Sequence, residues 1–295
     1  MIVFIIGTGR CGSTLVHELL ARHPDVGFIS NLEDRLPRLP PRAGRFNNPL
    51  FRRVPPALTR KGRARFAPSE AYRMITLQVS SMLVDPVRDL VAADATPWLA
   101  KRLRAFFGER AAAQGQPIFL HKFTGWPRAG LLQAVFPDAH FINVVRDGRA
   151  VANSWLQMPW WSGYQGQSRW YLGPLPEAYA REFEASGGSF VLLAGLAWKL
   201  LMDAFERARA AVPPDKWLDV RIEEVDADPR GQFATLLKFL DLEWTSAFEA
   251  GFARHSFHSG RSEAFRRDLD PANLALLEGS LRDHLQAWGY PVRAG

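Results

Sequence analysis

The first fifteen residues of this 295-residue chain constrain its fold more than any other stretch. An apolar run at positions 2–6 leads into the glycine-rich segment 7–14, and from position 15 apolar residues recur on one face at helical spacing. This order predicts a buried strand, a tight turn and a helix. Such a turn directs several backbone N–H groups and the positive end of the helix toward one point, which makes it a candidate anion site.

The turn differs in an informative way from the nucleotide-binding loop G-x-x-x-x-G-K-[ST]. Gly7 and Gly12 have the required spacing, and Thr14 stands at the Ser/Thr position. Ser13, however, stands where that loop has its lysine, and the cation, Arg10, lies inside the turn. We therefore expect a phosphate-binding turn that is not built for ordinary ATP–Mg²⁺ chemistry. The alternative is a glycine-rich turn that only joins the strand to the helix.

The order of strand, turn and helix recurs along the chain, which indicates parallel β–α–β units. Further strands are predicted at 27–30, 118–122, 139–145 and 217–221. Helices are predicted at 69–84, 97–113, 131–136, 190–210, 229–240 and 271–288, with another that follows Arg149 and runs through Trp155. Because no repeat or linker interrupts this pattern, residues 1–295 are expected to form a single α/β domain. Its predicted fold is P-loop-like and three-layered, with a central parallel sheet flanked by helices.

Basic residues are concentrated in one segment. The net charge is +7, and positions 35–65 contain ten Arg or Lys residues and no Asp or Glu. The surrounding stretch 35–68 is rich in Pro and Arg and has little periodicity, so it predicts an irregular insertion such as a lid. A basic segment can contact nucleic acid, an acidic membrane surface or an anionic substrate. A solvated lid with none of these roles fits the pattern equally well.

The only cysteine is Cys11, so no intramolecular disulfide can form, which fits a reducing compartment. The apolar start at 2–6 is too short for a signal peptide or a membrane span, and no other run has the length that a span needs. We therefore expect a soluble, cytoplasmic protein without a transmembrane segment. No Cys/His cluster has metal-ligand spacing, so no metal is expected.

Four segments resemble the sulfotransferase family. The turn at 7–14 is similar to the loop that binds the 5′-phosphosulfate in that family, and the His-Pro-Asp-Val at 23–26 follows at the offset seen in its tyrosylprotein and bacterial branch. Segment 136–149, with Ser154 after it, resembles the segment that binds the 3′-phosphate, and 221–240 is also similar. These similarities cover most of the chain outside 35–115 and the tryptophan-rich part.

The resemblance implies 3′-phosphoadenosine 5′-phosphosulfate as the donor, whose sulfuryl group is transferred to a hydroxyl or amine of an acceptor. A donor with phosphates at both ends needs two anion sites, and hydrogen bonds to charged partners are among the strong ones. The residues that would bind the donor are Gly9, Arg10, Cys11, Gly12, Ser13 and Thr14 at the 5′ end, Arg146 and Ser154 at the 3′-phosphate, and Arg261 in a basic loop near the C-terminus. Arg146 could instead form a structural salt bridge with Asp147 or Asp138.

Three residues are predicted to be catalytic. Arg10 and Lys122 would stabilise charge on the leaving phosphate, since Lys122 matches the family lysine at this place. Glu33 would be the base, because the tyrosylprotein branch has a glutamate shortly after His-Pro-Asp-Val, although its spacing here is shifted and Asp34 remains an alternative. His121 is not expected to be the base, because it would point to the opposite face of the strand from Lys122.

The acceptor is not identified by the sequence. Residues 155–171 are dense in aromatic side chains and glycine without periodicity, so they could form part of an acceptor pocket or a hydrophobic plug under a loop. A small molecule, a carbohydrate, a lipid or a peptide all fit, and the oligomeric state stays open. Two other functions are weighed against this one: a P-loop kinase, and a non-enzymatic nucleic-acid-binding protein that uses 35–65. No stable nucleic-acid complex is expected, because the segment lacks a recognisable reading module.

Overall fold

The computed structural model describes residues 1–53, 66–166, 169–257 and 262–292. Its centre is a parallel sheet, which within these residues has five strands in the order β2-β3-β1-β4-β5. The strands are β1 (Ile2–Ile6), β2 (Val26–Phe28), β3 (Ile118–Lys122), β4 (His140–Val145) and β5 (Trp217–Arg221). After β1 the chain forms β2 and β3 on one side of β1, and it then crosses to form β4 and β5 on the other side. The carboxyl ends of β1 and β4 therefore form a topological switch point, the place where open parallel α/β sheets bind their ligands.

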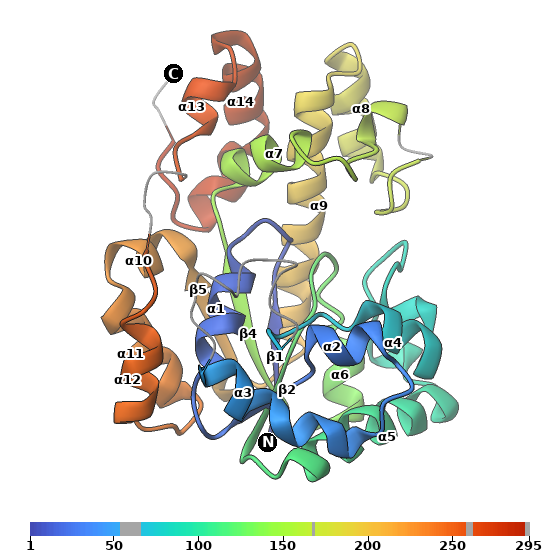
Figure 1. The fold of residues 1–295 in the computed structure, drawn as a ribbon. Coiled ribbons are helices and arrows are strands. Elements are labelled where there is room, and N and C mark those ends of the chain that lie inside the picture. The colour runs from blue at the N-terminus through green and yellow to red at the C-terminus, as the bar shows by residue number, and fades with distance from the viewer. Residues whose placement is uncertain (54–65, 167–168, 258–261, 293–295) are drawn as a thin grey trace.

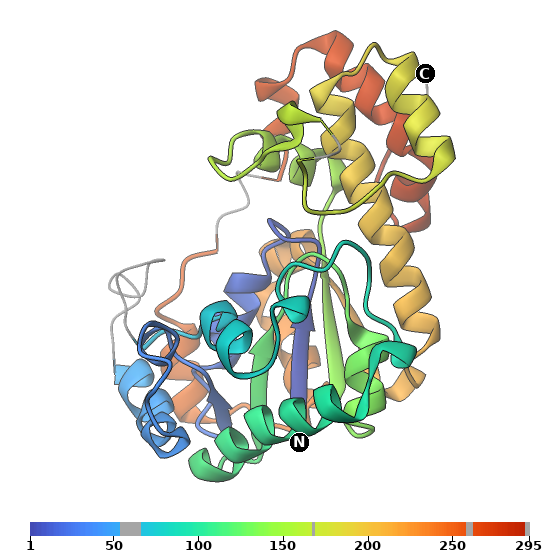
Figure 2. The same cartoon turned by 90° about the vertical axis from the view of Figure 1, so that its right-hand side faces the viewer.

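Helices cover both faces of the sheet (Figures 1 and 2). On one face, apolar side chains of α1 (Ser13–Leu20), α10 (Ile222–Ala227), α11 (Pro229–Phe239) and α12 (Ser246–Phe252) pack in one core with Val3 and Ile5 of β1. On the other face, α4 (Tyr72–Gln78), α5 (Pro97–Gln114), α6 (Ala129–Val135) and α9 (Phe190–Ala210) pack in a second core with Phe4 and Ile6. The alternating side chains of β1 therefore serve both cores, and the predicted three-layer α/β fold is confirmed.

A helical layer lies beyond the carboxyl ends of the strands. It contains α7 (Gly148–Leu156), α8 (Glu177–Ala185), α13 (Phe265–Asp268) and α14 (Pro271–Ala287), and both views show the long α9 running from it alongside the sheet (Figures 1 and 2). Helix α7 packs against α9 and α14. No helix in the part of the chain that the structure describes is long and apolar enough to cross a lipid bilayer.

The segment predicted as an irregular insertion is partly helical, so that prediction is wrong for its first half. It contains the end of α2 (Asn31–Arg35), a 3-10 helix η1 (Pro41–Phe46) and α3 (Asn47–Arg53), while 54–65 lie outside the described residues. Helix α3 is anchored by polar contacts that hydrophobic periodicity does not reveal. The amide of Asn48 donates to the backbone carbonyls of Ala21, His23 and Val26 at 2.8–3.0 Å.

The predicted helix at 69–84 is also shorter than expected. The structure has α4 followed by a 3-10 turn, η3 (Ser81–Leu83), since the Ser80 hydroxyl accepts a hydrogen bond from the Met82 N–H and starts a new turn. Three further 3-10 helices lie in connections between the longer elements: η4 (Ala92–Asp94), η5 (Gly163–Gln165) and η6 (Pro214–Lys216). The longer predicted elements agree closely with the structure, including β3, β5 and α9.

Candidate active site

The turn at 7–14 has the conformation that its glycines allow. Gly9, Arg10 and Gly12 have φ angles of 81°, 55° and 88°, and Gly12 caps the N-terminus of α1. A side chain at Gly7 would approach the Val144 carbonyl oxygen to 2.7 Å, because the turn crosses closely over the end of β4. The backbone is therefore folded around a small space at the positive end of α1, the arrangement that binds phosphate groups.

Gly12 offers a direct test of this packing. A Cβ at position 12 would collide with Ile222, and φ there is unfavourable for any other residue. Gly12→Ala is expected to lower the free energy of unfolding by about 1–3 kcal/mol. The matched control is Gly108→Ala in α5, because a Cβ at Gly108 meets nothing within 4 Å. This variant should raise the free energy of unfolding by about 0.5–1 kcal/mol. Urea unfolding of both variants measures this, and equal effects would contradict the packing argument.

The predicted residues of the turn surround one cavity, with one exception. Gly9, Arg10, Gly12, Ser13 and Thr14 all line a cavity of about 580 Å³ at the carboxyl ends of the strands. Cys11 does not, because its side chain is fully buried beneath the turn, in the core shared with α1. Any contact of Cys11 with a ligand would thus be made by its backbone.

The structure brings Arg10, Arg146 and Ser154 together. The Nε of Arg10 donates to the Ser154 hydroxyl at 2.9 Å, and an Arg146 guanidinium nitrogen donates to the Arg10 carbonyl at 2.9 Å. Arg146 and Arg10 also line the cavity. Two segments far apart in sequence, the turn after β1 and residues 146–154 around α7, therefore meet at the same end of the sheet.

The sequence reasoning missed the role of Arg149. This buried arginine, rather than Arg146, forms the ion pair with Asp147 at 2.7 Å, and it also pairs with Glu278 of α14 at 2.6 Å. The pair with Glu278 joins α7 to α14, and the pair with Asp147 lies at the start of α7. The alternative of a structural salt bridge between Arg146 and Asp147 is thus replaced by one from Arg149. The Arg-Asp-x-Arg spacing contained this possibility but could not choose between the two arginines.

Lys122 lies at the end of β3 and reaches the start of α1. Its ammonium group donates to the Thr14 hydroxyl at 2.7 Å and forms an ion pair with the Glu70 carboxylate at 2.8 Å, and the lysine is only 4% exposed. Thr14, Glu70 and Lys122 all line the cavity. A cation and a carboxylate therefore stand within one hydrogen bond of each other beside the turn.

His121 points away from this site, as the alternation of the strand predicts. Its ring is fully buried and packs against Phe107 at 5.0 Å and Phe123 at 4.7 Å between ring centroids. Burial, reinforced by the charge of Lys122, lowers the pKa of His121 to about 3. At neutral pH the ring is an uncharged part of the core.

The structure places Glu33 away from the cavity. Glu33 belongs to a capping box at the start of α2, in which its carboxylate accepts the Ser30 N–H at 2.9 Å while the Ser30 hydroxyl accepts the Glu33 N–H. The same carboxylate also accepts a hydrogen bond from the Asn47 amide, and Glu33 is only 3% exposed. Asp34, the alternative, accepts the Met74 N–H at 3.0 Å. Both carboxylates therefore have local structural partners, and neither lines the cavity.

No sequence signal could have identified Glu70 as a residue of this site. It follows the basic segment directly, in a stretch without secondary structure before α4, and no motif of the resemblance includes it. Its neighbour Tyr72 also reaches the cavity, where its hydroxyl contacts the Thr124 hydroxyl at 2.9 Å. Burial raises the pKa of Tyr72, so its hydroxyl keeps its proton at neutral pH.

The aromatic stretch lies partly at the cavity and partly in the core. Trp155, Trp160 and Tyr171 line the cavity, together with Trp126, whereas Trp161 is buried and stacks on Trp155 at 5.7 Å. The buried indole N–H groups of Trp126 and Trp155 have no hydrogen-bond partner among the described residues. The aromatic wall thus offers apolar surface to a bound molecule.

Glu18 on α1 lies near Lys122 and has an unusual titration. Burial raises the pKa of Glu18 to about 7, while the charges of Lys122 and Arg22 pull it down. Since the native carboxyl binds its proton up to a higher pH than the unfolded one, its contribution to stability is full below about pH 4.5 and is lost as pH rises through about 7.

Glu18→Gln is expected to remove the loss of stability that the parent protein shows as pH rises through about 7. The stability of the variant relative to the parent protein should increase by about 1–3 kcal/mol between pH 5 and pH 8. Urea unfolding at pH 5, 6, 7 and 8 measures the difference, with Glu206→Gln on the exposed face of α9 as the control. A difference that stays constant with pH would contradict the buried titration.

Two further expectations concern Arg261 and metal binding. Arg261 lies outside the described residues, so the closing basic loop remains a prediction from the sequence. Among the residues that are described, no group of three or more His, Cys, Asp or Glu side chains is placed to hold a metal ion.

Three solved structures with a similar fold are distant in sequence. The sulfotransferase domain of an olefin synthase from Synechococcus PCC 7002 is 17% identical, with 99% of this chain and 95% of that chain covered and a TM-score of 0.53. Sulfotransferase STF1 from Mycobacterium tuberculosis H37Rv is 18% identical, covering 90% and 75%, with a TM-score of 0.55. STF9 from Mycobacterium avium is 14% identical, covering 99% and 78%, with a TM-score of 0.55. At this identity the likeness concerns the fold.

The family follows from the sequence. A search of curated protein sequences found no significant match. A model of the family described as "Sulfotransferase family", however, matches residues 3–246, which include the turn, β1 to β5 and the residues that surround the cavity. The chain therefore belongs to the sulfotransferase family and is a sulfotransferase enzyme.

Proposed function

We propose that this sulfotransferase uses 3′-phosphoadenosine 5′-phosphosulfate as its donor and transfers the sulfuryl group to a hydroxyl or amine of a small acceptor. The observation that carries the proposal is the position of Lys122, between Thr14 at the phosphate-binding turn and Glu70 at the cavity. A cation for the leaving group and a base for the acceptor are thereby adjacent at the anion site.

The residues fit a donor with anionic groups at both ends. The backbone of the turn at 7–14, with the side chains of Ser13 and Thr14, would hold the 5′-phosphosulfate at the positive end of α1. Arg146 and Ser154 would hold the 3′-phosphate, with Arg10 linking the two sites through its contacts to both residues. Guanidinium groups suit this task because they bind phosphate oxygens in pairs.

In the proposed reaction the acceptor oxygen attacks sulfur while the bond from sulfur to the bridging oxygen breaks. The acceptor proton passes to the Glu70 carboxylate, and the products are the sulfated acceptor and 3′,5′-bisphosphoadenosine. Lys122 and Arg10 would stabilise the negative charge that develops on the bridging oxygen, and such electrostatic stabilisation is commonly the largest part of catalysis. Glu70 takes the place of Glu33 as the proposed base, because a base must reach the acceptor proton.

The cavity favours an acceptor that carries its hydroxyl on an apolar or aromatic body. The cavity of about 580 Å³ is lined by the turn at one part and by aromatic residues at another, so the reacting end of the donor and part of the acceptor would share it. Trp155, Trp160 and Tyr171 supply flat apolar surface on which such a body could pack. A screen of phenols, steroid-like alcohols, sugars and peptides with labelled donor would identify the class.

The donor assignment has a direct binding test. The bisphosphate product, 3′,5′-bisphosphoadenosine, should bind and raise the unfolding temperature, whereas adenosine 5′-phosphate, which lacks the 3′-phosphate, should bind about 10- to 100-fold more weakly. Arg146→Gln should remove most of that difference. Calorimetric titration measures both affinities. Stabilisation by ATP–Mg²⁺ without any by the bisphosphate would favour a kinase and contradict the proposal.

A further inference from the structure

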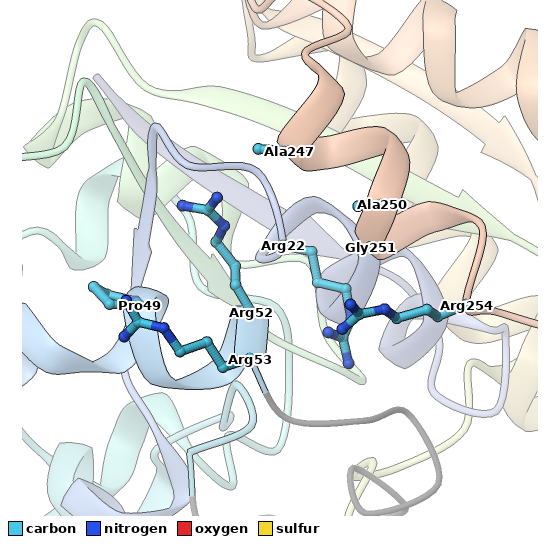
Figure 3. A pocket seen from close by; sticks show the side chains of 8 residues that line it. All are labelled: Arg22, Pro49, Arg52, Arg53, Ala247, Ala250, Gly251 and Arg254. Atoms are coloured by element: carbon cyan, nitrogen blue, oxygen red, sulfur yellow. The ribbon is translucent and has the colours of Figure 1, made fainter.

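A second hollow, lined by arginines, lies on the other end of α1 from the active site. It is a pocket of about 260 Å³ between the end of α1, helix α3 and helix α12, and it shares no lining residue with the active-site cavity. Its polar lining consists of Arg22 just after α1, Arg52 and Arg53 at the end of α3, and Arg254 just after α12 (Figure 3). No carboxylate is among the described residues that line it.

Two of the charges in this pocket lie close together. Arg22 and Arg254 repel each other electrostatically, and Figure 3 draws their guanidinium groups in one place. Arg52 and Arg53 extend from α3 on the other side of the hollow, with their guanidinium groups directed away from this pair. Burial lowers the pKa of Arg22; the Glu18 carboxyl opposes this, and the like charge of Arg254 adds to it. Since arginine stays protonated in proteins, the repulsion persists in the folded state, and an anion between the groups would relieve it.

Arg22 is rigidly positioned in the wall. The residue is only 1% exposed, its guanidinium lies 4.4 Å from the centre of the Phe51 ring, and one of its nitrogens donates to the Phe51 carbonyl at 3.4 Å. On the other side, a Cβ at Gly251 would come within 3.1 Å of the Arg22 side chain, so only glycine lets α12 approach this closely. The position of this charge is therefore set by packing and not by solvent.

The hollow itself depends on small side chains. Ala247, Ala250 and Gly251 present a nearly flat face of α12 to the pocket, and Pro49 of α3 lies opposite. Larger residues on α12 would fill the space between the arginines. A concave space that is lined by several arginines, with Arg22 held in place by packing, is suited to a compact anion, whereas an extended polyanion is usually bound along an exposed basic stripe.

We propose that this pocket binds a phosphate or sulfate group, either the free ion or a monoester, at a site separate from the donor site. The tetrahedral oxygens of such a group match paired N–H donors of guanidinium forks. The volume of about 260 Å³ leaves room for a small organic part beside the anionic group. The donor assignment is not needed for this inference, because the two cavities have different walls.

The test uses the full chain and calorimetric titration with inorganic phosphate, inorganic sulfate and glycerol phosphate, each in the presence of saturating 3′,5′-bisphosphoadenosine. One additional site with a dissociation constant of about 1 mM or lower is expected, since two or three charge-assisted hydrogen bonds supply that affinity. Tighter binding of glycerol phosphate than of both free ions would identify a monoester as the ligand, and the reverse order would identify the free ion.

Two variants separate the pocket from general basicity. Arg53→Gln/Arg254→Gln replaces two exposed arginines of the wall and should weaken anion binding by about 10- to 100-fold, with the transfer reaction at its parental rate. Ala250→Leu fills the hollow without a change of charge and should have a similar effect. Arg282→Gln, an exposed arginine of α14, is the matched control and should bind as the parent does.

Three outcomes would overturn the proposal. The first is the absence of additional anion binding to the parent protein. The second is binding that the double variant retains in full, which would place the anion elsewhere. The third is binding of long polyanions only, with a steep dependence on salt, which would indicate an extended surface. If the bisphosphate itself fails to bind, the proposed donor is wrong, and the same variants compared without it still test the pocket.

Discussion

Glu70→Gln is expected to lower the rate of sulfuryl transfer by about 10²–10⁴-fold while binding of 3′,5′-bisphosphoadenosine stays within a few-fold of the parent. The amide cannot take up the acceptor proton, but it keeps the shape of the side chain and a hydrogen-bond acceptor for Lys122, which lies 2.8 Å from the carboxylate. Turnover with labelled donor measures the first effect, and calorimetry with the bisphosphate measures the second.

Glu33→Gln is the matched control for this prediction. Glutamine can replace glutamate in a capping box, so the variant should keep the contacts to Ser30 and α2 with a stability change of about 1 kcal/mol or less. Its transfer rate should be close to that of the parent. An inactive Glu33→Gln beside an active Glu70→Gln would show that Glu33 is the base after all.

Lys122→Met is expected to lower the transfer rate by about 10²–10³-fold, the usual effect of removing one group that stabilises transition-state charge. The methionine fills much of the same space without the ammonium group, so the bridging oxygen loses its nearest proposed cation. Binding of the bisphosphate should weaken by about 10-fold. Single-turnover kinetics with saturating donor separate the effect on the chemical step from the effect on binding.

Lys101→Met serves as the control for this variant, because Lys101 is an exposed lysine of α5. It should show parental kinetics. Since Lys122 is buried and paired with Glu70, Lys122→Met leaves a partly buried carboxylate without its cation. Unfolding should therefore be measured alongside, and a loss of activity explained wholly by unfolded protein would contradict the catalytic role.

The parts of the fold that could be predicted from sequence are those stabilised by local patterns. The helix over 190–210 and the strands at 118–122 and 217–221 were predicted with the bounds that the structure has. The apolar residues of the helix recur at helical spacing, the strands are short runs rich in apolar residues, and proline or glycine lies near the ends of all three elements. Helix α3 was missed because Asn48 anchors it to carbonyls of another segment, and such a contact leaves no periodic signal.

The same division applies to the active site. The turn at 7–14 could be recognised because glycine spacing and the following helix are local properties, and Lys122 could be placed because β3 alternates regularly. The carboxylate that pairs with Lys122 could not be predicted, because the position of Lys122 at the end of a strand does not show which distant residue will lie next to it. Glu33 had the expected position, yet its capping box uses its carboxylate locally.

The sequence by itself determined the family, which a match over residues 3–246 shows, and also the glycine-rich turn and the strand that carries Lys122, because the turn and the strand depend on residues close together in the chain. Only the tertiary structure decided that Glu70 pairs with Lys122, that Arg10 joins Ser154 and Arg146, and that four arginines from three helical segments form one pocket. The physical reason is that these contacts join residues far apart in the chain. Their distances are set by how the helices pack on the sheet, which no local pattern specifies.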